Sequence, residues 1–162
     1  MKKFDVGNWD GGADAVLRKR NRDKDNKDFL KGSNCPPSLD FLSIVVEGVR
    51  LYEDYDSVFI IDFHFTRKTT LRMEEADEDC DGLIAKAWNV NVTNATNLRR
   101  YLRTDNFNEL EGAIIRLKRV MRTNPRTEEL VPTFIVYAVK MRGKSEFVTV
   151  AKRQELEMEE DD

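Results

Sequence analysis

The sequence predicts a mainly β domain, a barrel of five or six strands with one helix between the third and fourth strands. Three observations lead to this class. Several short segments are rich in β-branched and aromatic residues, turn-forming residues separate them, and one segment repeats its apolar residues at helical spacing. At 162 residues, the chain is long enough for one buried core and too short for two ordinary domains.

Charge and apolar content divide the chain into three expected parts. Residues 1–40 hold few apolar side chains and many charges, so we expect a polar N-terminal arm. Residues 41–151 are expected to form the barrel domain, and residues 152–162 a disordered acidic tail. No segment reads as a signal peptide or a membrane span, so we expect a cytoplasmic protein, in the host cytoplasm if it is viral.

The first two strands are expected to pair as a hairpin. Residues 41–52 are apolar and β-branched, with Gly48 where a bulge or sharp bend fits, and residues 53–57 have turn composition before a second strand at 58–65. Alternation places four large apolar side chains on one face of that strand: Phe59, Ile61, Phe63 and Phe65. A row of this size predicts core positions.

A third strand and a short helix are expected next. An acidic connector at 74–81 leads to a strand at 83–92. Apolar residues then recur at three- and four-residue spacing: Leu98, Tyr101 and Leu102. Thr93 or Asn94 can cap this helix, which ends before Asn106.

The remaining chain predicts two long strands and one short one. They lie at 113–121, 131–141 and 146–150, with turns at 123–126 and 142–145. A helix between strands three and four of five is the arrangement of the OB barrel. We therefore expect an OB-like fold.

Three stretches resemble the single-stranded-DNA-binding proteins of bacteriophages, which are OB barrels with an acidic C-terminal tail. They are FLSIVVEGVRLYEDYDSVFIIDFHF (41–65), GLIAKAWNVNVTNATNLRRYL (82–102) and ELEMEEDD (155–162). The resemblance implies sequence-tolerant coating of single strands in phage DNA replication or recombination. It also implies a tail that contacts other replication or recombination proteins. Residues 1–40 have no counterpart in it.

The acidic residues gather at the end of the chain. Six of the 30 acids follow Gln154, so the rest of the chain holds 27 bases and 24 acids. These six are Glu155, Glu157, Glu159, Glu160, Asp161 and Asp162. A mobile acidic tail on a mildly basic body can compete with a bound polyanion or recruit partners, although it can also serve only solubility.

Candidate contacts to nucleic acid combine cations with aromatic rings, because single strands bind through phosphates and stacked bases. In the fourth strand, Arg116, Lys118 and Arg122 fall on the side opposite an apolar row of Ile115, Leu117 and Met121. The alternative is an ordinary solvated strand face. Further candidates are Arg50, Tyr52, Tyr55, Arg67, Lys68, Lys86 and Trp88. Trp88 fits the core equally well.

The common enzyme and metal motifs are not found in the sequence, so we expect no catalytic residues, metal or cofactor. Two other functions stay open. A viral structural or assembly protein would use the arm and tail to wrap neighbouring copies. An inhibitor that mimics nucleic acid would act through the acidic runs 74–81 and 155–162. The sequence does not decide whether the nucleic acid is DNA or RNA, or whether the protein forms a homo-oligomer.

Overall fold

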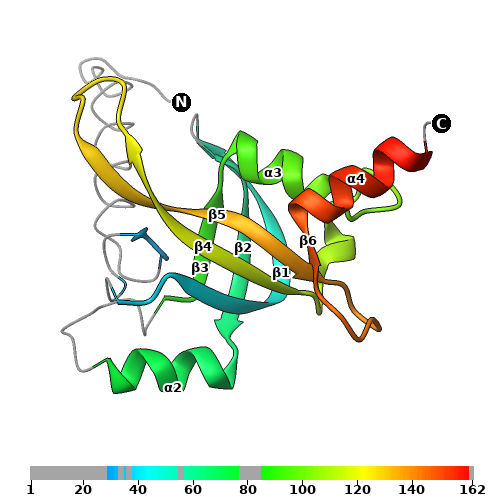
Figure 1. Ribbon diagram of the computed structural model, residues 1–162, viewed down its shortest axis with the longest axis horizontal. Coiled ribbons are helices and arrows are strands. Elements are labelled where there is room, and N and C mark those ends of the chain that lie inside the picture. The colour runs from blue at the N-terminus through cyan, green and yellow to red at the C-terminus, as the bar shows by residue number, and fades with distance from the viewer. Residues whose placement is uncertain (1–28, 33–34, 36–37, 55–56, 77–84, 161–162) are drawn as a thin grey trace, which may run out of the picture.

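The computed structural model describes residues 29–32, 35, 38–54, 57–76 and 85–160. One antiparallel sheet has the strand order β3-β2-β1-β4-β5-β6 (Figure 1). The strands are β1 (Phe41–Asp54), β2 (Ser57–Phe65), β3 (Ala87–Val90), β4 (Ile114–Thr123), β5 (Leu130–Lys140) and β6 (Val148–Thr149). The helices are α2 (Arg67–Glu75), α3 (Val92–Arg99), the 3-10 helix η3 (Phe107–Leu110) and α4 (Val150–Glu160). The predicted mainly β class is confirmed, with α3 between β3 and β4.

β1 is the strand around which the sheet curls. Its first residues, Phe41 to Val45, pair with β4, and the strand from Ile44 onward pairs with β2. The register shifts between Val46 and Gly48, so the irregularity expected at Gly48 is confirmed. The edge strands are β3 and β6, but β6 pairs only with Ala138 and Val139, so the part of β5 before these residues is also an edge. The sheet is thus a barrel-like curl with an open seam between β3 and this part of β5.

The core lies inside this curl. Phe59, Ile61, Phe63 and Phe65 are buried as predicted. Further buried side chains come from β1, β4, α3 and η3: Leu42, Ile44, Ile115, Leu117, Leu98 and Leu110. The Phe107 ring lies 4.5 Å from that of Phe59, so η3 covers one end of the core.

Helix α3 closes part of the seam between β3 and β5. Asn94 is 2% exposed, its Nδ2 donates to the Phe134 carbonyl at 3.0 Å, and its Oδ1 accepts from the Val136 amide at 3.0 Å. The side-chain amide therefore completes backbone hydrogen bonds that a neighbouring strand would otherwise make. Asn94 lies inside the helix, because the N-cap is Asn91, and the expectation of a cap at Thr93 or Asn94 is wrong.

A second part of the seam is closed by the segment Phe29–Gly32. Phe29 forms a parallel bridge with Ala87 of β3, and the Leu30 amide donates to the Ala87 carbonyl at 2.8 Å. Gly32 packs directly on Pro132 of β5. Leu30, Cys35 and Leu39 are buried in the core. The expected boundary near residue 40 is therefore wrong: packing begins at Phe29 at the latest, and residues 1–28 lie outside the described part.

Three expected elements differ from the structure. Helix α2 follows β2 in a segment for which no element was predicted, and it overlaps the connector expected at 74–81 only in its last two residues. Thr66 caps the helix, and of its residues only Thr69 and Met73 are buried. β3 spans Ala87–Val90 within the segment expected at 83–92, of which residues 83 and 84 lie outside the described part. β6 has two residues, and α4 begins directly after it. No helix in the described ranges is long and apolar enough to cross a membrane.

The chain end expected to be disordered is helix α4, so that expectation is wrong up to Glu160. Glu157 Oε2 lies 2.8 Å from Arg100 Nη1, and Arg153 Nε donates to the Arg100 carbonyl at 2.6 Å. The Tyr101 hydroxyl donates to the Val148 carbonyl at 2.7 Å. Burial raises the pKa of Tyr101 to about 12, although Arg153 and Arg100 act to lower it. The hydroxyl therefore stays a donor at neutral pH.

The Arg100–Glu157 pair predicts a measurable contribution to stability. Both side chains are about one third exposed, so we expect Glu157→Gln to lower the free energy of unfolding by about 1 kcal/mol. Glu155→Gln is the matched control, because Glu155 forms only an exposed pair with Lys152 at 3.5 Å. Its effect should stay below about 0.3 kcal/mol in urea titrations of both variants. Equal losses would mean that α4 is not held by Glu157.

Candidate nucleic-acid interface

The outer face of β1 and β4 carries the basic row predicted from alternation. In β4, Ile115 and Leu117 are fully buried, whereas Arg116 and Lys118 are partly exposed on the opposite side. Met121, expected in the buried row, is 51% exposed, because β4 extends beyond the core at its end. Ser43 pairs with Arg116 and Phe41 with Lys118 across the β1–β4 ladder. Both cations therefore stand beside outward-facing residues of β1.

Aromatic rings lie among these cations. The Phe41 and Tyr137 rings meet edge to face, with centroids 5.1 Å apart and planes at 69°. Tyr137 is the extra residue of β5 where the β4–β5 register shifts, and it is 38% exposed. Lys118 Nζ lies 5.9 Å from the Phe41 centroid, and Arg116 Cζ lies 4.2 Å from that of Phe147. These contacts hold both cations against apolar surface.

Helix α2 converts this face into a pocket. The Thr66 amide donates to the Ser43 carbonyl at 3.0 Å, and the Ser43 amide donates to Thr69 Oγ1 at 3.0 Å. These bonds fix the first turn of the helix against β1. The space between the helix and this face measures about 410 Å³ and is open to solvent on one side. We call it the basic-aromatic pocket; its lining residues are Phe41, Ser43, Thr66, Lys68, Thr69, Arg72, Arg116 and Tyr137.

All charged side chains that line the pocket in the described part of the chain are positive. They are Lys68, Arg72 and Arg116, and the described part of the lining contains no carboxylate. Among the described residues, none of these three cations forms an ion pair. Arg50 provides the contrast, since its guanidinium makes two hydrogen bonds to Asp62, at 2.7 and 2.9 Å. Unpaired cations around one concave site favour an anionic ligand.

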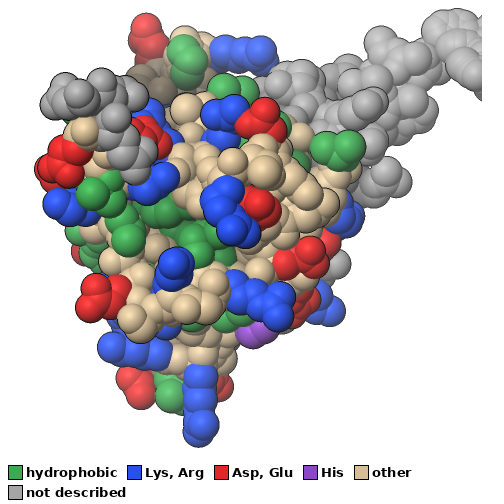
Figure 2. Space-filling view, turned by 90° about the vertical axis from the view of Figure 1, so that its right-hand side faces the viewer, with side chains coloured by type: hydrophobic (Ala, Val, Ile, Leu, Met, Phe, Trp, Pro, Cys, Tyr) green, Lys and Arg blue, Asp and Glu red, His purple; other side chains and the backbone are tan. Residues whose placement is uncertain are grey.

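A larger hollow at another end of the molecule has a different character. It measures about 1060 Å³ and lies among η3, α4 and the loop after β5, with Tyr101, Met141 and Leu156 among its lining residues. Its lining carries charges of both signs. The basic residues are Arg103, Arg142, Lys144 and Arg153, and the acidic residues are Glu109, Glu111 and Glu146. Figure 2 shows basic and acidic side chains interspersed around apolar ones on this side. This mixture gives no preference for a polyanion.

No match to this chain was found among models of protein families, curated proteins or solved structures. Its function is therefore argued from the geometry of the pocket and the face around it.

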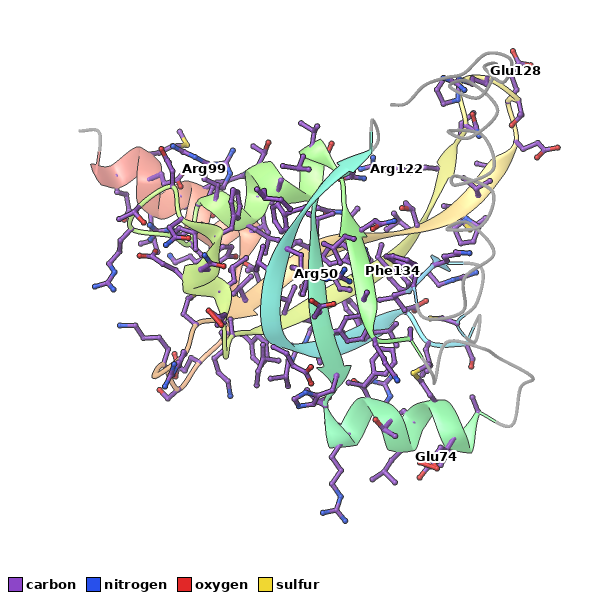
Figure 3. The ribbon with its side chains drawn as sticks, turned by 180° about the vertical axis from the view of Figure 1, so that it is seen from behind. Arg50, Glu74, Arg99, Arg122, Glu128 and Phe134 are labelled. Carbon is purple, nitrogen blue, oxygen red and sulfur yellow. The ribbon has the colours of Figure 1, made fainter. Side chains whose placement is uncertain are left out.

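The structure brings together some of the residues predicted from sequence. Lys68 and Arg116 line the basic-aromatic pocket, and Lys118 adjoins it through Phe41. Arg67 is exposed on the first turn of α2 but does not line the pocket. Arg122 is exposed on the β4–β5 hairpin, which projects beyond the barrel with Glu128 (Figure 3).

Other predicted residues lie elsewhere. Trp88 is 4% exposed in the core, so its assignment as a stacking residue is wrong. Lys86 is exposed just before β3, and Arg50 lies on the β1–β2 side (Figure 3); neither lines the pocket. The side chain of Tyr52 and the whole of Tyr55 fall outside the described part of the chain.

The predicted tail residues have different surroundings. Glu157 is paired with Arg100 and Glu155 with Lys152, whereas Glu159 is exposed on α4. The side chain of Glu160 and residues 161–162 are outside the described part. Of the other acidic run, Glu74 and Glu75 end α2 on its exposed side, and residues 77–84 are not described.

Sequence reasoning missed four residues of this face: Phe41, Arg72, Tyr137 and Phe147. Alternation with the buried Leu42 would have placed Phe41 outward. Arg72 could have been found by reading Thr66 as a helix cap followed by good helix formers. Tyr137 depends on a register shift that leaves no sequence signal.

Proposed function

We propose that the protein binds single-stranded DNA without sequence preference and does not act as an enzyme. The observation that carries this proposal is the basic-aromatic pocket, where three cations that have no carboxylate partner among the described residues lie around two aromatic rings in edge-to-face contact. Single strands are held by cations along the phosphates and by aromatic faces under the bases. The OB-like strand order supports the proposal, since such barrels commonly bind oligonucleotides.

The proposed path runs from the pocket along β4. Arg116, Lys118 and Arg122 share one face of β4, with Val120 at the position between the last two, so the row spans about 20 Å at the usual strand rise. Arg126 extends it into the turn of the β4–β5 hairpin. The hairpin projects beyond the body of the barrel (Figure 1), where it can contact a strand that leaves the pocket.

The acidic end has a separate proposed role. α4 lies across the molecule from α2 (Figure 1), and Glu157 is engaged with Arg100. Contact with replication or recombination proteins is therefore proposed for the exposed carboxylates of α4, such as Glu159, and for the residues that follow. Competition with DNA would require α4 to leave α3. The proposed site of action is the cytoplasm.

The proposal is tested by fluorescence anisotropy with labelled oligo-dT and the matching duplex at several salt concentrations. We expect the single strand to bind more tightly than the duplex. We expect Arg116→Gln combined with Lys118→Gln to weaken that binding at least about tenfold and to reduce the slope of log K against log salt by about 1.4. Each lost phosphate contact removes about 0.7 of this slope for a single strand.

The matched control removes the same charge away from the pocket. Lys86→Gln combined with Lys144→Gln changes two exposed lysines that do not line the pocket, and its effect should stay within about threefold. Equal losses in both double variants would show that only net charge matters. Absence of binding by the unaltered chain would overturn the proposal, and a stable oligomer without nucleic acid would then favour an assembly protein.

A further inference from the structure

The basic-aromatic pocket is a recess, open to solvent on one side, at one end of the basic row. α2 walls it on one side, and its volume of about 410 Å³ falls in the range of small-molecule sites. A strand that only passed over β4 would need a continuous groove. A recess of this size instead suits one nucleotide unit.

The charge of the recess exceeds what an internal phosphate supplies. Lys68, Arg72 and Arg116 provide three positive charges. A phosphodiester inside a strand carries one negative charge, whereas a phosphomonoester carries about 1.5 to 2 at neutral pH. A phosphomonoester therefore matches the three cations more closely.

A buried hydroxyl adds a donor to this site. Thr69 is 4% exposed, and its Oγ1 accepts hydrogen bonds from the Ser43 amide and from the Thr66 hydroxyl. The bond between the Thr66 and Thr69 hydroxyls uses only one of their two protons, so this pair, which lines the pocket, has one further proton without an acceptor among the described residues. An anion that accepts this proton would complete the network.

The two rings provide the other half of a nucleotide site. Phe41 and Tyr137 line the same recess as the three cations, and Tyr137 is 38% exposed. A phosphate held by the cations would place the attached sugar and base beside these rings. Base stacking on such rings depends little on base identity.

We infer that the basic-aromatic pocket binds a phosphomonoester, namely the terminal phosphate of a nucleic-acid strand or the phosphate of a free mononucleotide. For a strand end, the inference rests on the proposed single-stranded-DNA binding, and the protein then prefers phosphorylated ends. Strand passage along β4 requires no such preference.

The test compares oligo-dT of about 12 nucleotides carrying a 5′-phosphate, a 3′-phosphate or only hydroxyl ends, bound to the full chain. A phosphorylated end should bind about tenfold more tightly than hydroxyl ends, because charge-assisted hydrogen bonds are the strong ones. The oligonucleotide with the higher affinity shows whether the pocket binds the 5′-phosphate or the 3′-phosphate of a strand. Binding of a free mononucleotide is tested by titrating dTMP into the protein without any oligonucleotide and following the NMR chemical shifts of the protein.

Variants within one helix give the control. Lys68→Gln combined with Arg72→Gln should abolish the gain from the terminal phosphate and the binding of dTMP. Arg67→Gln removes a neighbouring exposed charge that does not line the pocket and should leave the gain within about twofold. Thermal unfolding verifies that each variant is folded.

The outcomes separate the two proposals. Equal affinity for all three oligonucleotides, with no binding of dTMP, would overturn the phosphomonoester site and leave single-stranded-DNA binding intact. If no oligonucleotide binds but dTMP does, and Arg72→Gln weakens it, the site stands and the proposed function fails. A gain that persists in the Lys68 and Arg72 double variant would also overturn the site.

Discussion

Asn94→Ala should lower the free energy of unfolding by about 3–4 kcal/mol, the largest loss we expect from a single polar side chain. The substitution leaves two buried backbone groups of β5, the Phe134 carbonyl and the Val136 amide, without their partner. Each unsatisfied buried group costs about 1–3 kcal/mol, and the lost side-chain volume adds to this. Urea titration at neutral pH measures the loss.

Two further variants separate hydrogen bonding from packing. Asn94→Leu restores side-chain volume without the amide, so we expect it to be nearly as destabilising as alanine. Asn97→Ala changes a half-buried asparagine of the same helix and should cost less than about 0.5 kcal/mol, since alanine is the better helix former. Recovery of stability by leucine would show that Asn94 acts through packing and does not bridge the seam.

The strands could be predicted because burial of one face imposes a period of two. In β2, four alternating side chains from Phe59 to Phe65 are buried, and in β4 the buried Ile115 and Leu117 left Arg116 and Lys118 outside. Gly48 marked the bend of β1. These features follow from local pattern alone.

The segments around the sheet could not be predicted in the same way. α2 has no apolar stripe, because only Thr69 and Met73 are buried. Phe29 and Leu30 are two apolar residues beside a highly charged stretch, and their burial depends on the seam between β3 and β5. The acidic composition of α4 hid a helix that is held by Arg100. In each case tertiary contact decides the structure.

Only some residues of the candidate site could be predicted from the sequence, for a related reason. Arg116 and the adjoining Lys118 follow from alternation in β4, whereas Lys68 and Arg72 stand on helix α2, which was not predicted. Phe41 and Tyr137 meet only because β4 pairs with both β1 and β5. Trp88 was weighed as a surface platform, but it is the kind of large side chain that a small core needs. Sequence pattern places residues on faces, and pairing decides which faces meet.

Gly32→Ala should destabilise the protein by about 3 kcal/mol, because the new methyl group would overlap backbone that cannot easily move. A Cβ at this position would lie 2.5 Å from both the carbonyl carbon and the oxygen of Pro132, and 2.8 Å from the Thr133 amide nitrogen. Relief requires the segment to separate from β5. That movement would also break the 3.2 Å hydrogen bond from Arg119 Nε to the Gly32 carbonyl.

Gly48→Ala is the matched control for this prediction. A Cβ at Gly48 meets nothing within 4 Å, so alanine there should change stability by less than about 0.5 kcal/mol. Urea titration compares the two variants, and hydrogen exchange of the Leu30 amide reports whether the segment has left β3. A Gly32→Ala protein as stable as the Gly48→Ala protein would mean that Phe29–Gly32 does not close the seam. Of the two contacts across the seam, only the hydrogen bonds of Asn94 would then hold it. The loss of unfolding free energy in Asn94→Ala should be correspondingly larger.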